Sequence, residues 1–211
     1  MPYTRIKICG ITSVEDALTA VKAGADAIGL VFYPKSPRYV TIEQASAISR
    51  AVGPFVTTVG LFVDAGADEI YRVLRQVPLH ILQFHGNETA AFCSSFSRPF
   101  IKALRMSEDM NPVAQTEPFI IAGALGVLLD SYHSELPGGT GEVFSWDRIP
   151  IRQPLPLILA GGLNPDNVAV AIRQIHPYAV DVSSGVESTP GRKDSVRIRA
   201  FVEAVRDADR Q

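Results

Sequence analysis

The sequence predicts a (β/α)8 barrel, an α/β fold, built as a single domain over residues 1–211. Eight strand-like segments alternate with helical segments along the chain, which is typical of parallel sheets with crossover helices. Reactive or glycine-rich residues follow most of these segments, where such barrels carry their active sites. The 211 residues, 46% of them hydrophobic, suit one core and leave room for few insertions.

The eight expected strands are short segments rich in branched and aromatic residues. They are Arg5–Cys9, Ala27–Phe32, Val56–Val63, His80–Phe84, Phe100–Leu104, Gly126–Asp130, Leu157–Ala160 and Ala179–Val182. The competing fold is an open doubly wound sheet, which usually has about five or six strands and a first turn of the form GxGxxG. The first turn here, CGIT at residues 9–12, lacks that form, which favours the barrel.

Apolar residues at helical spacing mark the segments between the strands. Thr12 and Glu15 fit a capping box at the start of the first helix, and Thr41 and Gln44 fit another at the start of the second. The helix after the fourth strand is less regular, and two prolines interrupt the helix after the fifth. The helix after the sixth strand, around Trp146, is expected to be short.

The composition argues against several classes of protein. A formal net charge of −2 with scattered basic residues gives no electrostatic footprint for nucleic acid. The two cysteines form no CxxC pair, and the four histidines lack metal-ligand spacing, so neither disulfides nor metals are expected. The N-terminus lacks a signal-peptide pattern, and no apolar stretch approaches the roughly 20 residues of a membrane helix. We expect a cytoplasmic protein with no membrane, nucleic-acid or obligate protein partner.

The first strand ends in a candidate catalytic residue, Cys9. Because side chains alternate along a strand, Lys7 and Cys9 point to the same face, and the thiol lies at the carboxyl end near a basic group. A thiolate at this position suits a general base. The competing interpretation is that Cys9 is a small buried hydrophobe. Lys7 either favours the thiolate or only fills the barrel interior.

Three further side chains near strand ends are candidates. Asp130 follows the apolar run at residues 127–129, and apolar neighbours favour the protonated carboxyl group that a general acid needs; an N-cap or a solvated loop aspartate is the alternative interpretation. Arg38, in the loop after the second strand, has the donors to bind a carboxylate through two hydrogen bonds. His85 follows the fourth strand, where it either orients a ligand or has a structural role.

Glycines and serines follow the last two strands. Gly161 and Gly162 come after the seventh strand, and Ser183, Ser184 and Gly185 come after the eighth. Barrels commonly bind phosphate in these two loops, through exposed backbone N–H groups and a helix N-terminus. The combination predicts a phosphate site, and two tight turns without a ligand are the alternative interpretation.

These motifs together resemble those of the phosphoribosylanthranilate isomerase family of tryptophan biosynthesis. The matches lie in order between residues 6 and 194 and are KICGI at 7–11, SPR at 36–38, QFHG at 83–86, LLD at 128–130, GGTG at 138–141, AGGL at 160–163 and DVSSGVE at 181–187. The sequence departs from the family pattern at Phe84, where leucine is common, and at Ser145, where aspartate is frequent.

The resemblance implies a cofactor-free Amadori rearrangement of N-(5'-phosphoribosyl)anthranilate, a small sugar phosphate, to 1-(2-carboxyphenylamino)-1-deoxyribulose 5-phosphate. It implies that Cys9 is the catalytic base and Asp130 the catalytic acid. Arg38 would bind the anthranilate carboxylate, and His85 and Asp181 are expected to contact the substrate. The phosphate would bind to the loops after the last two strands.

Two other functions compete with this interpretation. A related isomerase on the same fold, acting on the aminoaldose phosphate of histidine biosynthesis, would be expected to use two aspartates. Cys9 stands where the first of these would lie, which argues against that activity. A sugar-phosphate-binding barrel without catalysis would need only the phosphate loops, so the presence of both Cys9 and Asp130 disfavours it.

Overall fold

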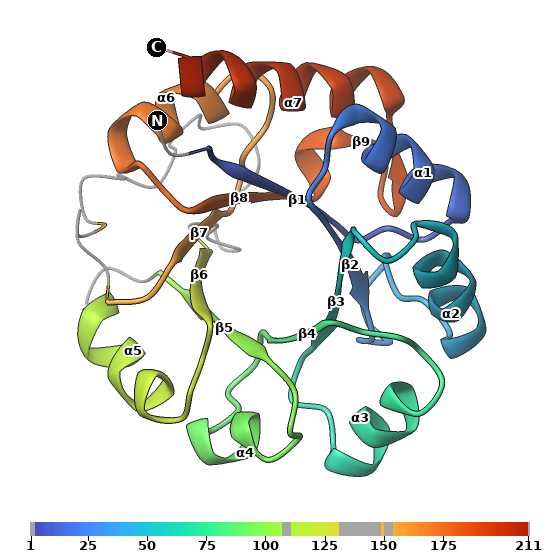
Figure 1. Cartoon of the computed structure of the whole chain (residues 1–211), viewed down its shortest axis with the longest axis vertical. Coiled ribbons are helices and arrows are strands. Elements are labelled where there is room, and N and C mark those ends of the chain that lie inside the picture. The colour runs from blue at the N-terminus through green and yellow to red at the C-terminus, as the bar shows by residue number, and fades with distance from the viewer. Residues whose placement is uncertain (1–2, 107–110, 131–148, 150–153, 211) are drawn as a thin grey trace.

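The computed structural model describes residues 3–106, 111–130, 149 and 154–210. Its centre is a closed barrel in which eight parallel strands pair in chain order and β1 pairs with β8 (Figure 1). The strands are β1 (Arg5–Cys9), β2 (Ala27–Val31), β3 (Thr57–Phe62), β4 (Ile81–Phe84), β5 (Phe100–Arg105), β6 (Gly126–Asp130), β7 (Leu157–Ala160) and β8 (Ala179–Val182). The predicted (β/α)8 barrel is confirmed, and the open doubly wound sheet is excluded.

Helices form a ring outside the barrel (Figure 1). They are α1 (Val14–Ala23), α2 (Ile42–Ala51), α3 (Ala67–Leu74), α4 (Ala90–Ser94), α5 (Pro112–Ile121), α6 (Val168–Ile175) and α7 (Ser195–Arg210). The predicted interruption of the fifth helix is wrong, because α5 begins with Pro112 at its first turn and continues through Pro118. The expected helix around Trp146 and the GGTG motif at 138–141 lie outside the described residues.

Alternation along the strands separates two apolar regions. On β1, Ile6 and Ile8 face outward into the main core between barrel and helices, whereas Cys9 packs inside the barrel against Val31 and Leu61. A separate apolar layer lies deeper in the barrel, from strands β3, β5, β6, β7 and β8. The interior is therefore filled with apolar side chains, and barrels of this kind carry their active sites at the carboxyl ends of the strands.

The start of α1 differs from the prediction by one residue. Its N-cap is Ser13, whose hydroxyl accepts a hydrogen bond from the backbone N–H of Asp16, so the predicted capping box of Thr12 and Glu15 is wrong. Thr12 is engaged elsewhere, since its hydroxyl donates to the carbonyl of Gly191 at 2.6 Å. The capping box at the start of α2 is confirmed.

A small hairpin, which the sequence pattern did not predict, follows β8. A 3-10 helix, η2 (Ser184–Val186), leads into the antiparallel strands β9 (Glu187–Thr189) and β10 (Arg192–Lys193). The contact from Thr12 and a hydrogen bond from the backbone N–H of Lys193 to Asp16 tie this hairpin to the beginning of α1. The hairpin thereby brings charged side chains to the mouth of the barrel beside β1.

None of the helices in the described part of the chain is both long and apolar enough to cross a lipid bilayer.

Candidate active site

The carboxyl ends of the strands bring the predicted site residues to one end of the barrel. Cys9 ends β1, Asp130 ends β6 and Asp181 lies near the end of β8. Going round the closed barrel, β1 and β6 are separated only by β7 and β8. The predicted base and acid therefore lie on strands that surround the same barrel mouth (Figure 1).

Cys9 is buried at the top of the barrel interior, with 6% of its surface exposed. The neighbouring strand makes room for it at Gly29, where an added Cβ would lie 2.7 Å from the Cys9 Sγ and 3.2 Å from Lys7 Nζ. Burial raises the pKa of the Cys9 thiol, and the positive charges of Lys7 and Lys193 offset this only in part. The thiol is therefore protonated in the resting protein at neutral pH.

Lys7 and Asp181 form a buried ion pair next to this thiol. The register of β1 and β8 places the two residues side by side, and Lys7 Nζ donates to the Asp181 carboxylate at 2.9 Å. Burial opposes the charge on Lys7, but the charge and the hydrogen bond of Asp181 raise its pKa, so Lys7 remains a cation. Of the two interpretations of Lys7, the structure supports electrostatic attraction to the thiolate in addition to filling the interior.

A chain of hydrogen bonds links Gln83, His85 and Asp130. The Gln83 amide nitrogen lies 3.0 Å from His85 Nδ1, and His85 Nε2 lies 3.2 Å from Asp130 Oδ2. With the Gln83 amide in this orientation, Nδ1 is the acceptor and Nε2 donates to Asp130, while Gln83 Oε1 is buried without a hydrogen-bond partner among the described residues. His85, after β4, therefore contacts the predicted acid at the end of β6, two strands further round the barrel.

The loop that carries His85 is held by a buried ion pair. Glu88 accepts hydrogen bonds from the backbone N–H groups of Asp64 and Gly86 and lies 2.9 Å from Lys102 Nζ. Lys102 also donates to the carbonyl of Gly86 at 2.6 Å. Each charge has several partners, which offsets the cost of its burial and fixes the end of β4.

Phe84, the departure from the family pattern, lies on the outer side of β4 in the same region. It is fully buried in an aromatic cluster with Phe92, Phe96 and Phe100, at ring-centroid distances of 6.1, 5.8 and 6.0 Å. The larger side chain is accommodated by packing against α4 and β5, away from the barrel mouth. The second departure, Ser145, lies outside the described residues.

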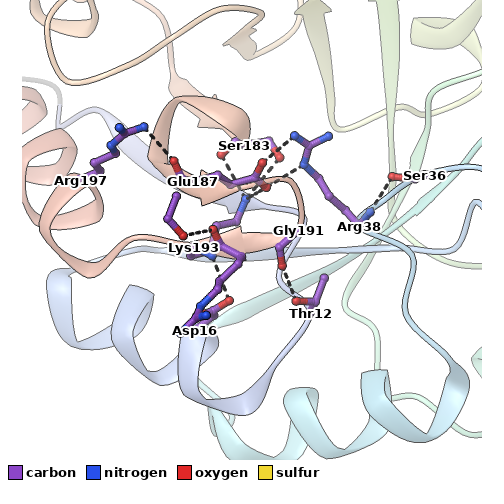
Figure 2. Close-up of polar contacts among 11 residues, drawn as sticks. Thr12, Asp16, Ser36, Arg38, Ser183, Glu187, Gly191, Lys193 and Arg197 are labelled. Atoms are coloured by element: carbon purple, nitrogen blue, oxygen red, sulfur yellow. Dashed lines mark hydrogen bonds and ion pairs between the residues drawn. The ribbon is translucent and has the colours of Figure 1, made fainter.

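Arg38 is held at the barrel mouth by Glu187. The Arg38 Nε donates to Glu187 Oε1 and its Nη2 donates to Oε2, both at 2.7 Å (Figure 2). The hydrogen bonds that Arg38 donates to Glu187, together with the charge of that carboxylate, raise the pKa of the Arg38 guanidinium, which is a permanent cation. The Ser36 hydroxyl accepts the backbone N–H of Arg38 and fixes the loop from which the side chain extends.

Lys193 completes this group of charges. Its Nζ donates to Glu187 Oε1 at 2.8 Å and to the backbone carbonyl of Ser183 at 3.1 Å. Burial alone would raise the pKa of the Glu187 carboxyl, but the hydrogen bonds and charges of Arg38 and Lys193 hold it below its usual range. Glu187 is thus an anion shared by two cations.

The two predicted phosphate loops touch each other. Gly161 and Gly162 have φ angles of 87° and 64°, a region that favours glycine. An added Cβ on Gly185 would lie 2.0 Å from the carbonyl oxygen of Leu163, so only glycine permits this approach of the loops after β7 and β8. Ser184, at the start of η2, is exposed. The geometry is compatible with a phosphate bound between the loops.

Two contributors were not identified as site residues from the sequence. Lys193 lies beyond the last motif that was assigned a role, and Glu187 was only quoted as part of the DVSSGVE motif. Glu187 could have been noticed as a charged residue in a loop with a predicted function, whereas Lys193 reaches the site through a hairpin that has no strong pattern. Within the described residues, no group of three or more His, Cys, Asp and Glu is arranged to hold a metal ion.

Comparisons with known proteins identify the family. The family model described as N-(5'phosphoribosyl)anthranilate (PRA) isomerase matches residues 6–204. The N-(5'-phosphoribosyl)anthranilate isomerase of Pseudomonas fluorescens (strain Pf0-1) is 58% identical over 206 residues, which cover 98% of this chain and 100% of that protein. Its counterpart in Pseudomonas aeruginosa (strain UCBPP-PA14) is 56% identical over 210 residues, covering 100% of this chain and 99% of that protein.

Solved structures agree with this family. The phosphoribosyl anthranilate isomerase of Thermotoga maritima has a TM-score of 0.83 and 41% identity, covering 97% of this chain and 99% of that one. A phosphoribosyl anthranilate isomerase in complex with reduced 1-(o-carboxyphenylamino)-1-deoxyribulose 5-phosphate has a TM-score of 0.79 and 39% identity, with the same coverage. This chain belongs to the N-(5'-phosphoribosyl)anthranilate isomerase family of enzymes.

Proposed function

We propose that this protein converts N-(5'-phosphoribosyl)anthranilate to 1-(2-carboxyphenylamino)-1-deoxyribulose 5-phosphate, a step of L-tryptophan biosynthesis, in the cytoplasm. Family membership supports the reaction, as does the related structure that binds a reduced form of this product. The observation that carries the mechanism is the placement of a carboxyl group, Asp130, and a thiol, Cys9, at one barrel mouth. One acid and one base suffice for the rearrangement.

Asp130 acts first, as the general acid. It gives its proton to the ring oxygen of the ribose while the bond from that oxygen to C1′ breaks. The lone pair of the anthranilate nitrogen forms the double bond of a protonated Schiff base, so electrons and charge balance. The hydrogen bond from His85 Nε2, at 3.2 Å, stabilises the carboxylate that Asp130 becomes.

Cys9 then acts as the general base. The positive charge on the Schiff-base nitrogen acidifies C2′, and the charge of Lys7 lowers the pKa of Cys9, whose thiol must release its proton to solvent before it can act. The thiolate removes the C2′ proton, and the electrons of the C–H bond neutralise the nitrogen to give an enolamine. The ketone forms when the Cys9 thiol gives its proton to C1′, which restores the thiolate, and the C2′ hydroxyl gives its proton to the Asp130 carboxylate, so that acid and base both end as they began.

Binding energy away from the reacting atoms holds the substrate in place. Arg38 binds the anthranilate carboxylate, and the loops with Gly161, Gly162, Ser183, Ser184 and Gly185 bind the phosphate. Because the carboxylate and the phosphate are bound at opposite ends of the substrate, C1′ and C2′ are aligned with the acid and the base.

A fluorescence assay that follows the loss of phosphoribosylanthranilate tests this function. We expect turnover by the unmodified protein, and a kcat lower by about 100-fold or more for Cys9→Ser. Cys93→Ser is the matched control, because Cys93 is buried on α4 outside the barrel, where burial raises its pKa to about 12. Its kcat should stay within about threefold of the unmodified value.

Two outcomes would contradict the proposal. Absence of turnover, together with tight binding of another sugar phosphate, would indicate a binding module. Turnover of the histidine-pathway aminoaldose phosphate alone would indicate the related isomerase.

A further inference from the structure

We propose that Glu187 is a positioning residue for substrate binding: it holds Arg38 by one edge of the guanidinium and leaves the other edge to bind the substrate's carboxylate. The inference rests on the proposed function, in which Arg38 binds that carboxylate. Glu187 takes no part in the acid–base steps. Through Arg38 it contributes to the selection of a substrate that carries a carboxylate.

The geometry of the guanidinium determines which edge remains. A planar guanidinium offers two pairs of parallel N–H groups, one from Nε and Nη2 and one from Nη1 and Nη2. Glu187 occupies the first pair through both carboxylate oxygens, each at 2.7 Å (Figure 2). No described residue accepts a hydrogen bond from Arg38 Nη1, so the second pair can bind a carboxylate end-on.

Glu187 is held too firmly to be displaced by a ligand. Only 4% of its side chain is exposed, and Lys193 Nζ donates to its Oε1 at 2.8 Å. The Arg197 guanidinium donates to its backbone carbonyl at 2.8 Å. Moving this carboxylate away from Arg38 would leave a buried, partly unpaired charge, which is costly. A substrate carboxylate therefore binds beside Glu187 and does not replace it.

The net charge of the group favours an anionic ligand. Arg38 and Lys193 both contact the single carboxylate of Glu187; burial lowers the pKa of Lys193 although Glu187 opposes this, whereas the Arg38 guanidinium is a permanent cation. Only 1% of the Lys193 side chain is exposed, whereas 24% of the Arg38 side chain is. The accessible part of this positive charge is therefore on Arg38, and it faces the entering ligand.

The aliphatic part of Arg38 is positioned as well. It crosses directly over Gly10, where an added Cβ would lie 2.4 Å from Arg38 Cδ and 3.1 Å from Cγ. The φ angle of +72° at Gly10 also favours glycine. Gly10 from the loop after β1 and Glu187 from β9 thus fix the two ends of one side chain, and the free edge of the guanidinium has a defined direction.

The hairpin has tethers that do not involve Glu187, and these provide a control. Thr12 donates to the carbonyl of Gly191 at 2.6 Å, and Asp16 accepts the backbone N–H of Lys193 at 3.2 Å (Figure 2). The variant Thr12→Val removes one tether and loosens the hairpin, but it leaves both hydrogen bonds between Arg38 and Glu187 in place.

The test compares two product analogues that differ in one group. One is reduced 1-(o-carboxyphenylamino)-1-deoxyribulose 5-phosphate, and the other is the same compound without the carboxyl group. We expect the unmodified protein to bind the first more tightly. Glu187→Gln should raise the Kd of the carboxylated analogue and the KM of the substrate about tenfold. The Kd of the carboxyl-free analogue and kcat should stay within about threefold, and Thr12→Val should not reproduce this selective loss.

The remaining outcomes each overturn the inference. Equal weakening of both analogues by Glu187→Gln would show a purely structural role, and unchanged or tighter binding of the carboxylated analogue would show that Glu187 does not position Arg38 for it. The proposed function is tested separately by Arg38→Met. If Arg38→Met abolishes the preference for the carboxylated analogue but Glu187→Gln does not, the function stands and this inference fails. If the unmodified protein binds the two analogues equally well, the assignment of Arg38 to the substrate carboxylate fails, and the inference about Glu187 fails as well.

Discussion

His85 Nε2 lies 3.2 Å from Asp130 Oδ2, and the Gln83 amide on the other side of the imidazole lies 3.0 Å from Nδ1. The amide fixes the ring with its proton on Nε2, so the histidine donates to the carboxyl group of the proposed acid. We propose from this relationship that His85 orients Asp130, and the substrate contact that the sequence resemblance implies for His85 stays a prediction.

The variant His85→Asn separates these two roles. We expect kcat to fall about tenfold with KM nearly unchanged, because a hydrogen bond to a charged group contributes about 1.5–3 kcal/mol. Steady-state kinetics measures both constants. His176→Asn is the control, because His176 is exposed at the left-handed C-cap of α6, where asparagine is tolerated. A raised KM with unchanged kcat for His85→Asn would instead indicate substrate binding.

The pH profile of kcat/KM should report the ionisation of Cys9. A general base must lose its proton, and burial raises the pKa of this thiol, so kcat/KM should rise with pH on the alkaline side of neutrality. Asp181→Asn removes a negative charge that raises this pKa, and should move the rise to lower pH. Lys7→Met removes a positive charge that lowers it, and should move the rise to higher pH. Shifts in the same direction, or none, would mean that another group titrates.

Replacement of Gly10 by alanine should displace Arg38. The added Cβ would lie 2.4 Å from Arg38 Cδ, so the side chain must move and the KM of the substrate should rise about tenfold or more. Gly53→Ala is a matched control, since its φ of +77° resembles the +72° of Gly10 but nothing lies within 4 Å of the added Cβ. Both variants should lose about 1 kcal/mol of stability to backbone strain, and only Gly10→Ala should change KM. An equal effect on KM would contradict the steric explanation.

The buried pair of Glu88 and Lys102 should be important for folding. Lys102→Met leaves Glu88 buried without its cation, so the free energy of unfolding should fall by about 3–5 kcal/mol. Denaturant titration measures this loss. Lys22→Met, at an exposed position near the end of α1, should change the free energy of unfolding by less than about 1 kcal/mol. A loss for Lys102→Met no greater than for this control would show that the pair contributes little.

The barrel could be predicted from the sequence because its strands carry local signals. β1, β6, β7 and β8 begin and end at the predicted residues, and the other four strands differ only at their ends. Buried parallel strands are continuous apolar runs, so their existence does not depend on distant contacts. The end of a strand does depend on its neighbours, which explains the small differences.

The charged network around Arg38 could not be predicted in this way. Arg38 and Glu187 are 149 positions apart, and their hydrogen bonds depend on the closure of the barrel and on the hairpin of β9 and β10. The partner of Thr12 could not be predicted either. Its residue type and spacing fit a helix cap, but its hydroxyl donates to the carbonyl of Gly191, 179 positions away, and does not cap α1. Motifs predicted which loops matter, and only the structure shows which side chains in them meet.

The kcat of Asp130→Asn tests the acid–base mechanism most directly. Asparagine keeps the size of the side chain but has no proton to give to the ribose ring oxygen. We expect kcat for phosphoribosylanthranilate to fall by about 100-fold or more, with KM within about threefold and the circular dichroism spectrum unchanged. A folded Asp130→Asn variant with near-native kcat would contradict the assignment of Asp130 as the proton donor.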